Sequence, residues 1–259
     1  RQDPPAIAAG RRPRRGTGRR ARAGRRPAAG RHHAIDDVVP AWQVRHGYRP
    51  PRAVGDAVFY EFGAGWDLTV PLAYWALGVE RQLLVDIHSN LRFDLVNGTI
   101  ARLERSDDER LVRRPGVADV AAAEDLEERF GISYVAPRDA RATGFDAGSV
   151  DFVSSTNTLE HIPAVDLAPI LTECRRLLRP DGVMSSRIDL RDHYSYFDRS
   201  LSPYNFLRYS DRAWWLFNSR LLYQNRLRRP DYLGAFADAG FEVVSETPSR
   251  PDDGELTTI

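Results

Sequence analysis

Acids and histidines that follow short apolar runs are the residues of this chain best suited to chemistry. Asp86 ends one such run, His161 comes shortly after a second, and His193 with Tyr194 follows a third. A strand-end carboxylate can accept hydrogen bonds from ribose hydroxyls, and an imidazole can remove a proton near pH 7. We therefore take His161, His193 and Tyr194 as catalytic candidates. The alternative is that each of them only supports the fold.

A glycine-containing turn lies between an apolar run and an apolar helical pattern. Its sequence is Glu61-Phe62-Gly63-Ala64-Gly65-Trp66. Glycine allows a tight turn and a close approach of the backbone to a ligand, and the following helix N-terminus favours polar or anionic groups. The pattern favours an adenosine-bearing cofactor. Leu68 stands where a third glycine would complete the dinucleotide-binding motif, so an ordinary strand-to-helix turn remains the alternative.

Further motifs follow this turn in a fixed order. Asp139-Ala140 precedes the segment Phe145-Asp146-Ala147-Gly148-Ser149-Val150-Asp151, and Leu178-Arg179-Pro180-Asp181-Gly182 comes later. Together with the glycine turn and Asp86, this series resembles the class I S-adenosylmethionine-dependent methyltransferases, in their small-molecule-type group. The resemblance covers roughly residues 54–244 and specifies no substrate.

The resemblance implies a cofactor role for particular residues. The glycine loop would lie against the methionine and ribose parts of S-adenosylmethionine, Asp86 on the ribose, the 139–140 pair beside the adenine, and Asn157 near the amino-acid end. The residues so assigned are Glu61, Gly63, Ala64, Gly65, Asp86, Asp139, Ala140 and Asn157. Two assignments have structural alternatives, because Asp86 could cap the next helix and Asp139 could be an ordinary turn acid. Asp67, beside the loop, is expected to cap a helix.

Alternating apolar patterns predict an α/β fold with a doubly wound, mostly parallel sheet. Strands are expected at 57–62, 82–87, 132–136, 150–155, 182–189 and 241–246, and helices at 69–78, 89–104, 119–130, 164–178 and 229–240. The strand ends, and hence the ligand, should share one edge of the sheet. Between the fifth strand and the last helix, residues 191–228 form an aromatic helical insertion. It could line an acceptor pocket as a lid or pack as an extra layer.

The two ends of the chain differ from the middle. Residues 1–35 contain arginine, alanine, glycine and proline with almost no large apolar side chain, which predicts a disordered arm. That arm could bind nucleic acid or have no role. Residues 36–259 should form the cofactor-binding domain. Few residues follow 246, and most favour turns, so we expect a C-terminally truncated sheet whose strand at 241–246 is poorly paired or displaced.

Composition bears on whether the chain is a membrane, secreted, disulfide-bonded or metal-binding protein. No apolar run approaches the roughly 20 residues of a membrane-spanning helix, and no signal-peptide pattern is visible, so a cytoplasmic protein without membrane contact is expected. The single cysteine cannot form an internal disulfide. The histidines lack a metal-ligand spacing, so no metal site is expected. The oligomeric state cannot be read from the sequence.

The favoured function is methyl transfer from S-adenosylmethionine to an unidentified, small-molecule acceptor. Three alternatives stay open: a non-catalytic binding module with the cofactor fold, an NAD(P)-dependent oxidoreductase, and a nucleic-acid methyltransferase that uses the basic arm. The incomplete glycine motif counts against the oxidoreductase. The residues after the fourth strand, Ser154-Ser155-Thr156-Asn157-Thr158, lack the N-P-P-Y-type signature of amino-methylating DNA enzymes.

Overall fold

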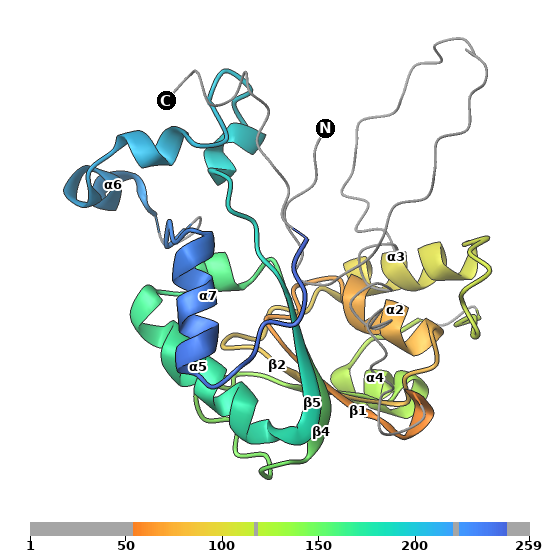
Figure 1. Cartoon of the computed structure of the whole chain (residues 1–259). Helices are drawn as coiled ribbons and strands as arrows, with labels where there is room; N and C mark the ends of the chain where they lie inside the picture. Colours follow the sequence, from red (N-terminus) through yellow and green to blue (C-terminus); the bar gives the residue numbers. More distant parts are fainter. Residues whose placement is uncertain (1–53, 117–118, 220–222, 248–259) are drawn as a thin grey trace, which may run out of the picture.

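The computed structural model describes residues 54–116, 119–219 and 223–247 (Figure 1). Five parallel strands form one sheet in the order β3-β2-β1-β4-β5. They are β1 (Val58–Phe62), β2 (Arg81–Val85), β3 (Ile132–Val135), β4 (Val150–Thr156) and β5 (Leu178–Arg187). The chain order reverses direction across the sheet between β1 and β4, and ligands of open α/β sheets bind at such a point. The predicted α/β class is confirmed.

Helices cover both faces of this sheet (Figure 1). The elements are η1 (Val54–Asp56), α2 (Thr69–Ala76), α3 (Phe93–Glu104), α4 (Ala123–Phe130), η2 (Leu159–His161), α5 (Ala164–Leu177) and α7 (Arg229–Asp238). One apolar cluster joins α2, α3 and α4 to β2 and β3, while a second joins α5 and α7 to β1, β4 and β5. All five β1 residues are buried, as expected for a central parallel strand covered on both faces.

The fifth strand begins earlier than its sequence predicted. Leu178 pairs with Val150, but the next paired residue is Val183, so residues 179–182 bulge out of register. A Cβ on Gly182 would lie 2.7 Å from Leu178 Cδ2 and 3.1 Å from two backbone oxygens. The residues that read as a turn therefore form a bulge within β5, where glycine is required.

The strand expected at 241–246 is absent, so that prediction was wrong. Described residues 241–246 belong to no strand, although Phe241 packs edge-on against Phe236 of α7. Arg229 pairs with Glu246 at 2.5 Å and holds this segment near the start of α7. The alternating pattern 241–244 lacks a paired neighbour strand, and without ladder hydrogen bonds a β pattern gives no strand.

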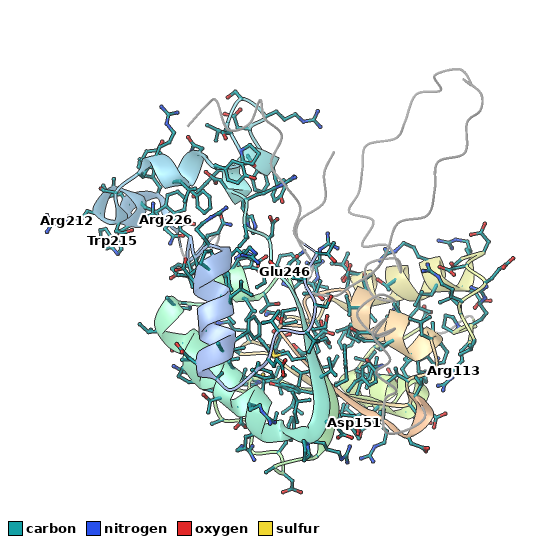
Figure 2. All side chains as sticks on the ribbon, viewed as in Figure 1. Arg113, Asp151, Arg212, Trp215, Arg226 and Glu246 are labelled. Carbon is teal, nitrogen blue, oxygen red and sulfur yellow. The ribbon has the colours of Figure 1, made fainter. Side chains whose placement is uncertain are left out.

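The described residues of the aromatic insertion form short helices beyond the carboxyl end of β5 (Figure 1). They are η3 (His193–Tyr196), η4 (Asn205–Arg208) and α6 (Asp211–Phe217). Phe206 and Trp214 form its buried centre with their rings 5.9 Å apart, whereas Trp215 is 77% exposed and points outward (Figure 2). The predicted helical insertion thus packs around its own small core. Its function as a lid stays a prediction.

Two further expectations concern the ends and the membrane. The arginine-rich arm at 1–35 lies outside the described residues. Among residues 54–116, 119–219 and 223–247, no helix has the length and apolar character needed to cross a bilayer.

Candidate active site

The glycine turn after β1 combines one crowded glycine with one open glycine. Gly63 has φ +70°, and a Cβ there would lie 2.3 Å from the Thr158 side chain. The Thr158 hydroxyl donates to the Gly63 carbonyl at 3.2 Å, which joins this turn to the segment after β4. Gly65 has φ +79° with no atom near its added Cβ. Its backbone therefore borders open space that a cofactor can use.

The missing third glycine has a structural consequence. Leu68 adopts φ +50°, a left-handed conformation that side chains rarely occupy, and is completely buried against α3 and α4. The following helix begins at Thr69, whose N–H donates to Asp67 Oδ1 at 3.2 Å. Asp67 therefore caps the helix, as predicted. Burial of the leucine side chain offsets the backbone strain.

Asp86 follows β2 and lies beside this turn. The carboxylate is 7% exposed and accepts from the Tyr134 hydroxyl at 3.4 Å. Burial raises the pKa of Asp86 to about 7, while the Tyr134 hydroxyl and the Ala64 N–H lower it. The next helix, α3, begins only at Phe93, so Asp86 does not cap it. This carboxyl group is a hydrogen-bond acceptor beside Ala64 of the glycine turn, and its ribose role stays a prediction.

Glu61 lies inside the sheet rather than on its surface. Its side chain is 3% exposed, and Ser154 Oγ donates to its Oε2 at 3.0 Å. Burial raises the pKa of Glu61 to about 8. The side chain therefore links β1 to β4 beneath the loop, and any cofactor contact there has to come from the loop backbone.

Asp139 and Ala140 follow β3. The Asp139 side chain pairs with an arginine, whereas Ala140 packs against the core. Asp139 accepts from the Arg141 guanidinium at 2.6 Å, and Arg141 also binds Asp166 at 2.6 Å. The hydrogen bonds from Arg141 lower the pKa of Asp139. Ala140 packs against the α5 core. These contacts match the turn-acid alternative, and an adenine contact stays a prediction.

Asn157 follows β4 in a left-handed conformation with φ +52°. Its N–H donates to the Arg187 carbonyl at 2.8 Å. The side-chain oxygen Oδ1 is buried and has no hydrogen-bond partner among the residues that the structure describes. An orphaned buried acceptor costs roughly 1–3 kcal/mol, and an ammonium group is a partner that would satisfy it. The residue therefore fits the amino-acid end of the cofactor.

Two of the predicted catalytic residues come together beyond Asn157. The rings of His161 and His193 lie 4.9 Å apart. His161 Nδ1 lies 2.8 Å from the Tyr223 carbonyl, which can only accept, so Nδ1 carries the proton and Nε2 holds a lone pair. Partial desolvation lowers the pKa of His161. The imidazole is thus a neutral acceptor near pH 7.

The third predicted residue lies elsewhere. The Tyr194 hydroxyl donates to the Phe217 carbonyl at 2.8 Å, and its ring packs edge-on against Trp214. The structure therefore places Tyr194 inside the insertion and does not bring it to the histidine pair.

Glu160 and Asp189, which complete a cluster with His161 and His193, had no predicted role. Glu160 is 3% exposed and accepts from the Asp189 N–H at 3.2 Å, while burial raises its pKa to about 8. Asp189 Oδ2 lies 3.5 Å from His193 Nε2 and accepts from the Tyr196 hydroxyl. The sequence signal that could have identified Asp189 was its position just after β5, four residues before His193.

Asn225 holds the cluster in place from the returning end of the insertion. Its side-chain amide donates to the Leu159 and Ile162 carbonyls at 2.8 and 2.9 Å, and its backbone N–H donates to the Glu160 carbonyl. Together these bonds fix η2, which carries Glu160 and His161. Asp151, by contrast, lies at the opposite end of the sheet (Figure 2) and accepts from the Val58 N–H at 2.9 Å, which is a structural role.

A methyltransferase-domain family model matches residues 114–185. The match spans α4 to most of β5, and it leaves the glycine turn and Asp86 outside. The order of the parallel sheet and this partial match agree with the predicted class I methyltransferase-like fold, and residues 114–185 are similar to a methyltransferase domain. S-adenosylmethionine is the cofactor of such domains. A comparison with curated protein sequences gave no match.

Solved structures with a similar backbone include three methyltransferases. A Haloferax volcanii methyltransferase bound to the Trm112 activator is 20% identical, with 74% of this chain and 63% of that chain covered and a TM-score of 0.42. Streptomyces coelicolor geranyl diphosphate C-methyltransferase is 15% identical, with 79% of this chain and 58% of that chain covered and a TM-score of 0.48. Haemonchus contortus phosphoethanolamine N-methyltransferase 2 is 16% identical, with 80% of this chain and 36% of that chain covered and a TM-score of 0.47. This chain spans less than two thirds of the length of each.

Proposed function

We propose that this chain transfers the methyl group of S-adenosylmethionine to a small-molecule acceptor. The observation that carries the proposal is the orphaned Asn157 Oδ1 on the same sheet edge as the open Gly65 backbone and the buried Asp86 carboxylate. These groups suit the ammonium, the thioether region and the ribose of one cofactor. Bound S-adenosylmethionine supplies an electrophilic methyl group on a sulfonium.

The protein's own contribution is to hold the cofactor and to orient it toward the acceptor. Asp86 would bind the ribose hydroxyls and Asn157 the ammonium group, which fixes the cofactor at both ends. Thr158 connects the glycine turn to the segment that carries His161. The histidine cluster is therefore the group that we assign to the acceptor. Alignment of donor and acceptor accounts for much of the rate enhancement of such reactions.

Ligand-dependent thermal unfolding tests this function against its rivals. S-adenosylhomocysteine at about 100 times its Kd should stabilise the chain by about 2.7 kcal/mol, which raises the Tm by several degrees. NAD and NADP should leave the Tm unchanged. A shift with NAD or NADP alone would favour the oxidoreductase.

Methyl transfer itself separates an enzyme from a binding module. Incubation with radiolabelled S-adenosylmethionine and pooled small-molecule acceptors should yield labelled product and S-adenosylhomocysteine. A chain that binds the cofactor tightly but transfers nothing to any of these pools would favour the non-catalytic module.

A further inference from the structure

We propose that Glu160, His161 and His193 bind one divalent transition-metal ion of the zinc, cobalt or iron kind. One ligand atom from each residue lies within 4.8 Å of the others. Two atoms that each lie about 2.0–2.2 Å from a metal are at most about 4.4 Å apart. Small side-chain rotations therefore close the cluster around an ion.

Unsatisfied buried atoms point to a missing ligand. Within residues 54–116, 119–219 and 223–247, Glu160 Oε2 and His193 Nε2 are both buried without a hydrogen-bond partner. Asp189 Oδ2 lies 3.5 Å from that nitrogen, which is long for a hydrogen bond. Glu160 is 3% exposed, so bulk water does not reach its carboxyl group. A cation would satisfy both atoms.

The second histidine is already oriented as a metal ligand. His161 Nδ1–H donates to the Tyr223 carbonyl at 2.8 Å, so its Nε2 lone pair is free to coordinate. Metal-bound histidines almost always donate their other ring N–H to a carbonyl or carboxylate. Asn225 fixes the backbone beneath this ring through three hydrogen bonds. The tautomer and the position are therefore both set before an ion arrives.

The donor types of the cluster also suit a transition-metal cation. Two carboxyl groups lie at the cluster: Glu160 is one of the three ligands, and Asp189 Oδ2 lies 3.5 Å from His193 Nε2. Two imidazoles favour zinc, cobalt or iron over magnesium, calcium or manganese, which prefer oxygen ligands.

A three-residue ligand set leaves coordination positions open. With the proposed function, on which this step alone rests, the open positions define the acceptor as a molecule with an oxygen donor, such as a hydroxyl or carboxylate. The ion would lower the pKa of a bound hydroxyl and so activate it. It would occupy the lone pair of His161, which then acts as a ligand and not as a base.

Metal binding is tested on the full, metal-stripped chain without cofactor or acceptor. Cobalt(II), followed by visible absorbance, and zinc(II), followed by calorimetry, should each bind as one ion per chain. Glu160→Gln, His161→Ala and His193→Ala should each weaken binding at least about tenfold. His88→Ala, which removes an exposed histidine outside the cluster, should leave it unchanged. Acetohydroxamate should change the cobalt spectrum if coordination positions are open.

Two results would overturn the site: no binding up to about 1 mM ion, the range of the weakest functional metal sites, or equal affinity in the three cluster variants and the wild type. An unchanged cobalt spectrum with acetohydroxamate would overturn the open positions. S-adenosylhomocysteine binding, measured in the same variants, shows that they fold. Loss of metal binding alone leaves the proposed function intact, and loss of cofactor binding alone leaves the metal site intact.

Discussion

Individual residues at one edge of the sheet hold polar groups that the folded chain leaves buried and poorly satisfied. Burial raises the pKa of Glu61 and Glu160 to about 8 and that of Asp86 to about 7, and Asn157 Oδ1 has no partner. Each of these features costs stability. Glu61 lies within β1, Asp86 follows β2, and Asn157 and Glu160 follow β4, so all of them lie toward the carboxyl edge of the sheet. Such a concentration indicates a binding site.

Substitutions at Asn157 test whether its side-chain oxygen Oδ1 contacts the cofactor. They can be chosen so that they add no backbone strain at this left-handed position. Asn157→Gly removes the oxygen, and glycine accepts φ +52° without strain. We expect about a tenfold loss of S-adenosylhomocysteine affinity, the equivalent of one hydrogen bond to a charged group, with no loss in Tm. Asn157→Asp, which keeps an acceptor, should retain binding. Calorimetry that finds Asn157→Gly equal to wild type would remove Asn157 from the site.

Glu61 predicts a pH dependence of stability for the ligand-free chain. Its folded pKa of about 8 exceeds the unfolded value near 4.5, so its contribution is full below pH 4.5 and is lost as pH rises toward 8. Ser154, Asp86 and Tyr74 are the groups that interact with it. Glu61→Gln removes the ionisation, so its Tm advantage over wild type should be larger at pH 8 than at pH 5. Equal differences at both pH values would contradict the buried, protonated carboxyl.

At the scale of elements, the turn between β1 and α2 depends on a residue in an unfavourable conformation. Leu68 is fully buried at φ +50°, a conformation that costs a non-glycine residue roughly 1–2 kcal/mol. Leu68→Ala should destabilise the fold by about 2–5 kcal/mol through the cavity it leaves.

The comparison with glycine isolates the strain at this position. Glycine normally destabilises by up to about 1 kcal/mol relative to alanine. At φ +50° relief of strain should reverse the order, so Leu68→Gly should unfold at the same or a higher denaturant concentration than Leu68→Ala. The opposite order in equilibrium unfolding would show that the left-handed conformation is not retained.

Sequence patterns predicted most elements because apolar periodicity reports burial directly. The five strands and the helices α2, α3, α4, α5 and α7 lie where the patterns placed them, although α3 and α4 begin four residues later than expected. The pattern at 241–244 failed because strand formation needs a paired neighbour. The turn at 179–182 became a bulge for the opposite reason, since β4 supplied a partner on both sides of it.

Parts of the site were predictable and others were not. The glycine turn and Asp86 follow from local sequence, because a strand end and a tight turn are local features. The cluster of His161 with His193, Glu160 and Asp189 depends on how the insertion returns through Asn225 to contact η2, and no local pattern encodes that contact. No local pattern indicated either that the Tyr194 hydroxyl donates to the Phe217 carbonyl, and a catalytic role of Tyr194 stays a prediction.

The whole molecule divides its tasks between two ends of one sheet. Asp151, which binds the Val58 N–H, lies at one end of the sheet (Figure 2), and the insertion lies at the other (Figure 1). Gly65, Asp86 and Glu160 follow the carboxyl ends of β1, β2 and β4. The two apolar clusters on opposite faces hold the strands, so that residues far apart in sequence share the carboxyl edge. The arm at 1–35 and its proposed binding of nucleic acid stay predictions.

The central claim, that this edge binds S-adenosylmethionine, is tested most directly by titrating S-adenosylhomocysteine into the full chain at pH 8, where Asp86 is ionised. We predict one site per chain and at least about a tenfold loss of affinity in Asp86→Ala, because hydrogen bonds to a carboxylate contribute about 1.5–3 kcal/mol each. Asp94→Ala, an exposed acid on α3, should bind as wild type. Absence of binding by the folded wild-type chain, or equal affinity in Asp86→Ala, would contradict the account.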